Sequence, residues 1–251
     1  MLLSSSELNA PPQTTLSTAD TSHATHETII LATNLSKSVG NGEHLLHILR
    51  DLQLDIRQGE RVAIVGSSGS GKSTLLGILA GLDIPTTGEV KILSKPFSHL
   101  DEDARAAMRG QYMGFVFQSF QLLPAMTALE NVMIPLQLNG HASPLETATA
   151  SLVSVGLGER LQHYPKQLSG GEQQRVAIAR AFAAQPAVLF ADEPTGNLDS
   201  ANGDKIIDLL FKLNQAHQTT LVLVTHDARL ASRCDRVLTL VDGKLNERSP
   251  T

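Results

Sequence analysis

One short segment constrains the fold of this chain more than any other: residues 66–73 read GSSGSGKS, between an apolar run at 62–65 and a helical pattern at 73–82. Glycine adopts positive φ at little cost and lets the backbone approach a ligand closely. The N–H groups of such a loop, next to a helix N-terminus, surround an anion. The spacing G-x-x-x-x-G-K-S in a strand-loop-helix context therefore predicts a nucleotide-phosphate site.

The side chains of this segment suit a nucleotide and a magnesium ion. We expect Lys72 to contact the β- and γ-phosphates, and Ser73 to offer its hydroxyl to Mg²⁺, which prefers oxygen ligands. An ordinary turn rich in Gly and Ser would need neither residue at these positions. The predicted nucleotide-binding residues are Gly66, Ser67, Ser68, Gly69, Ser70, Gly71, Lys72, Ser73 and Thr74.

The rest of the pattern predicts an α/β fold with a largely parallel sheet. Apolar runs at 188–190 and 221–224 are unbroken, which is typical of strands buried on both faces. Few strand signals fall within about 119–182, so we expect a helical subdomain there. Further strands are predicted at 29–31, 52–56, 62–65, 90–93 and 115–117, and helices at 73–82 and 173–182.

Capping boxes of the form S/T-x-x-D/E predict three helix starts, at Ser98 with Asp101, Thr127 with Glu130, and Ser169 with Glu172. The third box contains Gly170 and Gly171, which lower helix stability and suggest that a ligand approaches the backbone. The exposed N–H groups there could form a second anion site, although a simple helix cap explains Ser169 and Glu172 equally well.

Two further polar positions follow predicted strands. Asp192 and Glu193 directly follow the apolar run at 187–191, and His226 directly follows the predicted strand at 221–225. Alone, such a pair of carboxylates is most often a solvated strand end. Together with the phosphate-binding segment, Asp192 is predicted to hold Mg²⁺ and Glu193 to polarise an attacking water. His226 either donates to a γ-phosphate or is an ordinary loop histidine.

Composition excludes several classes of protein. A net charge of −5 argues against a chain held to nucleic acid by charge. The single cysteine, Cys234, allows no intrachain disulfide, and no apolar run approaches the length of a membrane span. Residues 1–27 are rich in Ser, Thr, Ala and Pro and lack Lys and Arg, which predicts a disordered tail without a secretory signal and a cytoplasmic location.

In this order, the motifs resemble those of the ATP-binding-cassette (ABC) ATPases. The resemblance implies a P-loop NTPase cassette over 28–246, with a RecA-like core, an antiparallel β subdomain and an inserted helical subdomain, followed by a short tail at 247–251. It implies that Gln118 senses Mg²⁺ and the γ-phosphate. It also implies a homodimer in which two ATP molecules lie between the phosphate-binding segment of one copy and Ser169, Gly170 and Gly171 of the other.

Finer resemblance points to a membrane partner. The strings 115–120, 168–180 and 192–199 resemble the group that includes LolD, MacB and FtsE, and 37–44 is most similar to the cassettes that accompany the membrane protein YbbP. An FtsX/MacB/YbbP-like permease, a periplasmic companion, and lipid, lipoprotein or related export at the cytoplasmic face of the bacterial inner membrane are implied. The alternative is a mechanotransmission ATPase that activates an extracytoplasmic hydrolase.

Three details complete these expectations. Gly66 and Ser169 are only 103 positions apart, which leaves no room for the coiled-coil arm or zinc module of DNA-acting cassettes. Val39 stands where many cassettes place an aromatic ring against adenine, so we expect weak discrimination between ATP and GTP, unless Val39 itself, His44 or His47 supports the base. Leu122, Leu123 and Met126 are equally candidates for partner contacts and for subdomain core.

Overall fold

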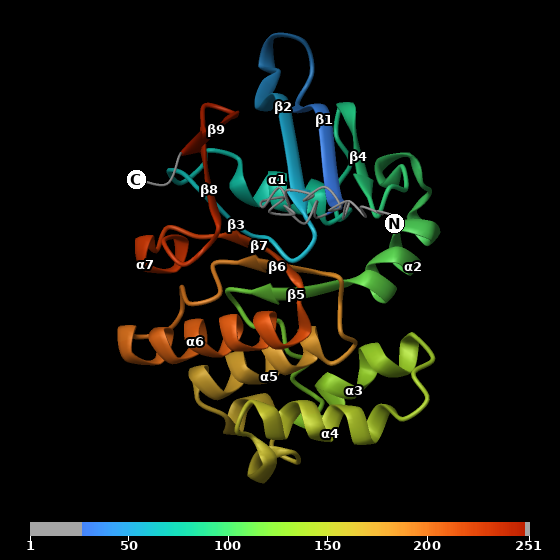
Figure 1. Cartoon of the computed structure of the whole chain (residues 1–251), viewed down its shortest axis with the longest axis vertical. Coiled ribbons are helices and arrows are strands. Elements are labelled where there is room, and N and C mark those ends of the chain that lie inside the picture. The colour runs from blue at the N-terminus through green and yellow to red at the C-terminus, as the bar shows by residue number, and fades with distance from the viewer. Residues whose placement is uncertain (1–26, 249–251) are drawn as a thin grey trace, which may run out of the picture.

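The computed structural model describes residues 27–248, so the predicted N-terminal tail lies almost entirely outside the described part. Two sheets and the helices around them form the fold (Figure 1). The strands are β1 (Thr28–Val39), β2 (Leu46–Arg57), β3 (Arg61–Val65), β4 (Thr87–Ile92), β5 (Met113–Phe117), β6 (Val188–Asp192), β7 (Thr220–Val224), β8 (Arg236–Val241) and β9 (Lys244–Arg248). The α-helices are α1 (Lys72–Leu79), α2 (Glu102–Tyr112), α3 (Ala128–Leu138), α4 (Pro144–Ser154), α5 (Gly170–Phe182), α6 (Ser200–His217) and α7 (Ala228–Ala231).

The larger sheet has the order β5-β6-β7-β3-β8-β9 and is parallel except for β9, which runs antiparallel to β8. Its unbroken apolar strands divide between two cores, because successive strand residues point to opposite faces. In β6, Val188 and Phe190 pack on the α1 side, whereas Leu189 and Ala191 pack with α5 and α6. This arrangement confirms the predicted α/β fold.

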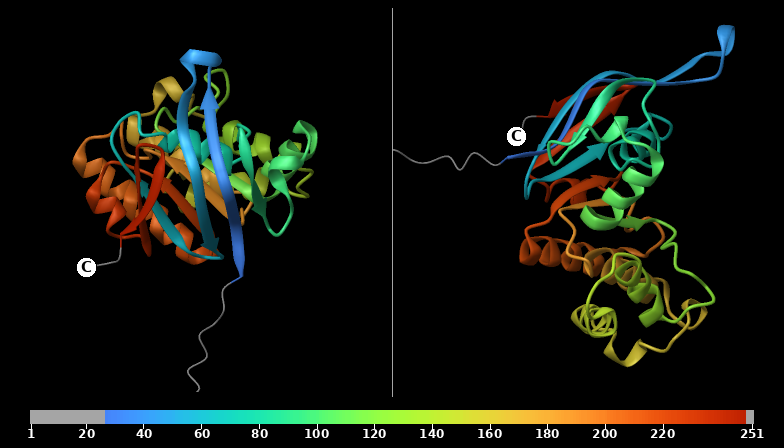
Figure 2. Two further views of the ribbon diagram at one scale, coloured as in Figure 1. Left: turned by 90° about the horizontal axis from the view of Figure 1, so that it is seen from above. Right: turned by 90° about the vertical axis from the view of Figure 1, so that its right-hand side faces the viewer.

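The smaller sheet is antiparallel, with the order β2-β1-β4, and covers α1 from the side opposite the larger sheet (Figure 1). Leu75, Ile78 and Leu79 of α1 are buried in the shared core of the two sheets. The β1–β2 hairpin extends beyond the rest of the molecule (Figure 2). Helix α1 is therefore fixed between two sheets, and its N-terminus has a defined place.

Helices α3, α4 and α5 share a separate apolar core, which includes Val132, Leu152 and Val176. Farther along α5, Ile178 and Phe182 pack instead on the larger sheet. The capping boxes of Thr127 and Ser169 both form, as predicted. Helix α5 thus joins the helical segment to the sheet. Within residues 27–248, no helix is long and apolar enough to cross a membrane.

The predicted capping box of Ser98 and Asp101 is wrong. Helix α2 begins at Glu102, and Asp101 caps it by accepting a hydrogen bond from the Ala104 N–H. Ser98 lies in a short 3-10 turn, and its Oγ accepts from the Val90 N–H at 3.0 Å. The extended backbone at Leu100 separates this turn from the helix.

At the other end of the chain, β9 continues to Arg248, two residues past the expected boundary at 246. It extends that far because it pairs with β8 along its whole length.

Candidate active site

The loop between β3 and α1, residues 66–71, forms a concave backbone surface that we call the phosphate loop. Gly69 and Gly71 have φ of 78° and 101°, and Gly71 is the N-cap of α1. A Cβ at Gly66 would lie 2.4 Å from the Leu240 carbonyl oxygen, so this position also requires glycine. Lys72 Nζ donates to the carbonyls of Gly66 at 3.0 Å and Ser67 at 2.8 Å, and its charge therefore lies across the loop.

The loop opens into a cavity of about 510 Å³, the phosphate cavity. Its walls include many of the predicted site residues, because β3, β6 and β7 are adjacent parallel strands whose carboxyl ends meet at one edge of the sheet. The predicted residues that line it are Gly66, Ser68, Gly69, Gly71, Lys72, Ser73, Thr74, Asp192, Glu193 and His226. Ser67 and Ser70 line an adjoining cavity, which shares Ser68 and Gly69 with the first.

Asp192 lies at the end of β6, opposite the start of α1. Ser73 Oγ donates to Asp192 Oδ1 at 3.4 Å. Burial raises the pKa of the Asp192 carboxyl above its usual range, and the charge of Glu193 acts in the same direction. The hydrogen bond from Ser73 and the charge of Lys72 oppose this shift. Two oxygen donors therefore face the cavity in a site that favours a nearby cation.

Glu193 has an unusual backbone conformation, with φ of 47° in the left-handed region that favours glycine. Its N–H donates to the Val224 carbonyl at 2.9 Å, which ties the turn after β6 to β7. His226, just after β7, places Nδ1 2.8 Å from Glu193 Oε2. The Glu193 side chain is 17% exposed and that of His226 72%, so the carboxylate lies deeper in the cavity than the imidazole.

Gln118 and the α5 N-terminus lie outside the phosphate cavity. Gln118 follows β5, and its Nε2 donates to Asn197 Oδ1 at 3.3 Å, while Asn197 Nδ2 donates to the Gln118 carbonyl at 2.8 Å. Ser169, Gly170 and Gly171, which we call the signature turn, do not line the cavity either. Within one chain, the structure does not bring the signature turn to the phosphate loop.

Sequence reasoning missed the β2 residues Leu46 and Ile48, which line the phosphate cavity. A Cβ at Gly71 would lie 3.1 Å from Ile48 Cγ2, which shows how closely β2 approaches the loop. Leu46 pairs with Val39 across the hairpin, and His47 Nδ1 lies 2.8 Å from Ser38 Oγ. The period-two alternation of Leu46 and Ile48 was the available signal, but it does not say which loop the strand faces.

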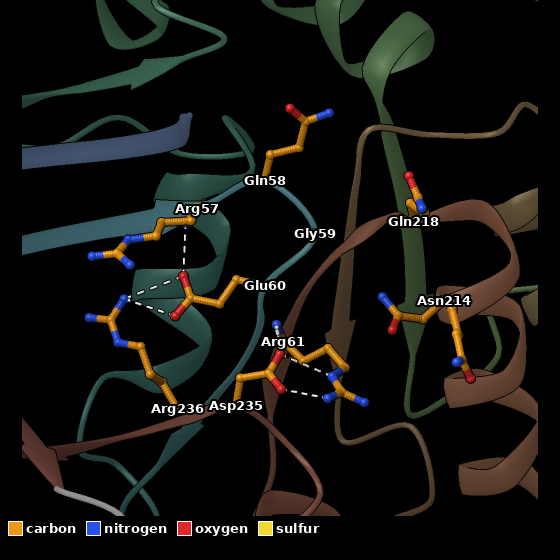
Figure 3. Close-up of a pocket in the computed structure, with 10 residues that line it drawn as sticks. Arg57, Gln58, Gly59, Glu60, Arg61, Asn214, Gln218, Asp235 and Arg236 are labelled. Carbon is orange, nitrogen blue, oxygen red and sulfur yellow. Dashed lines mark hydrogen bonds and ion pairs between the residues drawn. The ribbon is translucent and has the colours of Figure 1, made fainter. Parts of the chain in front are cut away.

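A second cavity, of about 760 Å³, lies at the opposite edge of the larger sheet (Figure 3). Four of its charged side chains form ion pairs, Arg61 with Asp235 and Arg236 with Glu60, and the Arg57 N–H donates to Glu60 Oε2. These pairs join β3 to the start of β8 and the segment before it. Ion pairs that join neighbouring strands in this way are typical of a structural role.

Fold and site together define a P-loop nucleotide-binding protein: a largely parallel sheet, a glycine-rich loop that caps a helix, and two acidic residues at the end of β6. The family model described as "ABC transporter" matches residues 49–196. The chain belongs to this family, and it is an ABC-type ATPase that binds ATP.

Curated relatives place the chain more narrowly. It is 58% identical over 225 residues to the ABC transporter ATP-binding protein YbbA of Escherichia coli K12, covering 89% of this chain and 99% of YbbA. It is 51% identical over 217 residues to the lipoprotein-releasing system ATP-binding protein LolD of Hydrogenovibrio crunogenus, covering 86% of this chain and 94% of LolD. The similarity to this group of cassettes, predicted from sequence, is confirmed.

Solved structures agree with the fold. A dimeric post-hydrolysis structure of the ATP-binding cassette MJ0796, bound to ADP and Pi, superposes with a TM-score of 0.82 at 42% identity, covering 88% of this chain and 98% of that one. A second dimeric MJ0796 structure gives a TM-score of 0.80 at 42% identity, covering 89% of this chain and 100% of that one.

Proposed function

We propose that two copies of this chain bind two ATP molecules between them and drive an FtsX/MacB/YbbP-like permease in lipid, lipoprotein or related export. The observation that carries the dimer is that the signature turn does not line the phosphate cavity of its own chain. Pairing across a two-fold axis brings each signature turn to the partner's phosphate loop. The dimeric form of the MJ0796 structures supports this arrangement.

The residues at the end of β6 and the start of α1 fit a magnesium ion. Ser73 Oγ and Asp192 Oδ1 are hard oxygen donors 3.4 Å apart, and both residues line the cavity. When bound, Mg²⁺ would neutralise charge on the β- and γ-phosphates. Lys72 and the loop N–H groups would hold the same phosphates. Gln118 would join this set through its Oε1, since its Nε2 is the atom that donates to Asn197.

Glu193 is the proposed general base. Its carboxylate would accept a proton from the water that attacks the γ-phosphorus, and the phosphorus–oxygen bond to the β-phosphate would break to release ADP and phosphate. The contact from His226 Nδ1 orients this carboxylate. Nε2, the other ring nitrogen, would donate to the γ-phosphate in the protonated imidazole, in which both nitrogens carry a proton.

Mixing two inactive variants tests the shared site. Homodimers of Lys72→Ala or of Ser169→Arg should each lose ATPase activity. Each mixed dimer contains one site with both halves intact, so a 1:1 mixture should recover about a quarter of the parental rate. No recovery, or full activity of a chain shown by light scattering to be monomeric under the assay conditions, would contradict the shared site.

An apolar groove of about 470 Å³ beside Gln121 is the proposed contact for the permease. It is lined by residues of α2, β5, α3, α5 and nearby loops, among them Leu82, Leu123 and Leu138, which are large exposed apolar side chains. Of the residues expected to contact the partner, Leu123 lies in this groove, whereas Leu122 packs against the core of the helical segment. The partner contact and the core role therefore fall on adjacent residues.

Charge substitutions test the groove. Leu138→Glu should abolish co-purification of the permease while ATP binding stays at the parental level, since the side chain lies away from the phosphate cavity. Leu145→Glu on α4 is the control, because Leu145 is also exposed but does not line the groove. Unchanged co-purification of the Leu138 variant would refute this contact. Co-purification of an extracytoplasmic hydrolase would favour the mechanotransmission alternative.

A further inference from the structure

Gln174 is a fully buried amide on a helix face that is otherwise apolar. Its side chain has no solvent exposure, and Ala177 and Ile178, three and four positions further along the same face of α5, are equally buried. Among the described residues, its Oε1 has no hydrogen-bond partner. Burying a polar group in this way is unfavourable, so a specific interaction of the other amide atom must be worth retaining.

That interaction reaches the turn of the catalytic carboxylate. Gln174 Nε2 donates to the Pro194 carbonyl at 2.6 Å, a contact between residues 20 positions apart. Pro194 directly follows Glu193, whose φ of 47° is held by its N–H bond to Val224 and by the Gly196 N–H that donates to the Glu193 carbonyl. Gln174 supplies the contact that fixes this turn from the side of α5.

We infer that Gln174 is a positioning residue that links the signature turn to Glu193. Gln174 lies five positions after Ser169 on the same helix, so movement of the α5 N-terminus shifts the Pro194 carbonyl with it. The inference rests on the proposed dimer. There, the signature turn of one chain contacts the nucleotide bound to its partner, while Glu193 acts on the nucleotide of its own chain. Gln174 is then a direct physical connection between the two active sites.

Gln174→Met tests the link, because methionine keeps the length of the side chain and removes the donor. We expect kcat for ATP to fall about tenfold, which corresponds to one lost neutral hydrogen bond, with KM changed less than about twofold. The Hill coefficient for ATP should fall towards one, since each site no longer senses the other. If Gln174 only filled the core, its replacement would not lower kcat selectively relative to KM, and it would not change the Hill coefficient.

Asn214→Leu is the matched control. Asn214 is also buried, and its Nδ2 donates to the Thr219 carbonyl, but it lies beside the second cavity at the far edge of the sheet (Figure 3). It should lose thermal stability with kcat and the Hill coefficient unchanged. A parental kcat and Hill coefficient in folded Gln174→Met would overturn the inference.

Gln174→Glu gives an independent readout if the methionine variant does not fold. A buried carboxyl has a raised pKa, and only its protonated form can donate to the Pro194 carbonyl. Its activity relative to the parental protein should therefore rise as the pH falls. A flat ratio, or failure of both variants to fold, would assign Gln174 to the core and overturn the link. ATP turnover by Glu193→Gln would contradict the proposed function itself, independently of the results for the Gln174 variants.

Discussion

An aromatic ring at position 39 should tighten nucleotide binding. Val39 is 50% exposed and pairs with Leu46, which is 65% exposed and lines the phosphate cavity together with Ile48. Since Leu46 and Ile48 line the cavity and Val39 pairs with Leu46, we expect the base of a nucleotide held by the loop to lie beside these aliphatic side chains. A tyrosine at position 39 would keep the hairpin register and present a flat face beside Leu46.

The size of the effect follows from stacking. Stacking of a base on an aromatic side chain is worth about 1–3 kcal/mol in nucleic-acid binding proteins, and aliphatic contacts recover part of this. A gain of about 1.4 kcal/mol corresponds to a tenfold lower Kd. We expect the parental protein to distinguish ATP and GTP weakly, because the phosphate loop and Lys72 contact groups that both nucleotides share. Val39→Tyr should tighten the binding of both.

Equilibrium titrations of ATP and GTP, in the Glu193→Gln background so that hydrolysis does not interfere, would measure these constants. His47→Ala is the control within the hairpin, since His47 contacts Ser38 and does not line the phosphate cavity. A strong preference of the parental protein for ATP, lost when His44 or His47 is replaced, would refute the aliphatic site and place base recognition on a histidine.

Three further perturbations test other parts of the structure. Glu193→Gln should keep ATP binding and a stable ATP-bound dimer but lower phosphate release at least about 100-fold; turnover near the parental rate would contradict its role as base. Burial raises the pKa of Asp192, so the nucleotide-free protein loses stability as the pH rises from the ordinary carboxyl pKa through the raised value. Asp192→Asn should therefore increase Tm at pH 7. This gain in Tm should shrink as the pH falls towards about 4. Gly81→Ala places a Cβ 2.3 Å from the Phe97 ring at φ of 66°, whereas Gly140→Ala, at φ of 67°, places it in open space. In denaturant unfolding, Gly81→Ala should therefore lower the free energy of unfolding by about 1–3 kcal/mol more than Gly140→Ala. Equal losses of stability would argue against the clash.

Local patterns were enough to predict the phosphate loop and the buried strands. The glycines and Lys72 form a motif whose geometry depends on adjacent residues. The unbroken apolar runs at β6 and β7 follow from burial on both faces. The β8–β9 hairpin was missed although Asp242 and Gly243, with φ of 48° and 75°, form the expected type of two-residue turn.

Other features depend on contacts that sequence patterns do not encode. Ser98 satisfies a capping pattern, yet its hydroxyl bonds to β4 because the chain turns at Pro96 and extends at Leu100. Ile48 and Gly71 belong to separate sequence patterns, and they come close only because the two sheets pack around α1. The same holds for Gln174, whose position beside Pro194 is set by the packing of α5 on the sheet at β5.

Separation of the signature turn from the phosphate loop also has a genetic consequence. Under the proposed pairing, a chain with a damaged signature turn inactivates the ATP site at the phosphate loop of its partner, even when the partner is parental. In a cell that makes equal amounts of parental and Ser169→Arg chains, random pairing leaves only about a quarter of the dimers with both sites whole. If the proposed export needs both sites, a plasmid-borne lesion of this kind would be dominant over an intact chromosomal copy, whereas a lesion that prevents folding would be recessive.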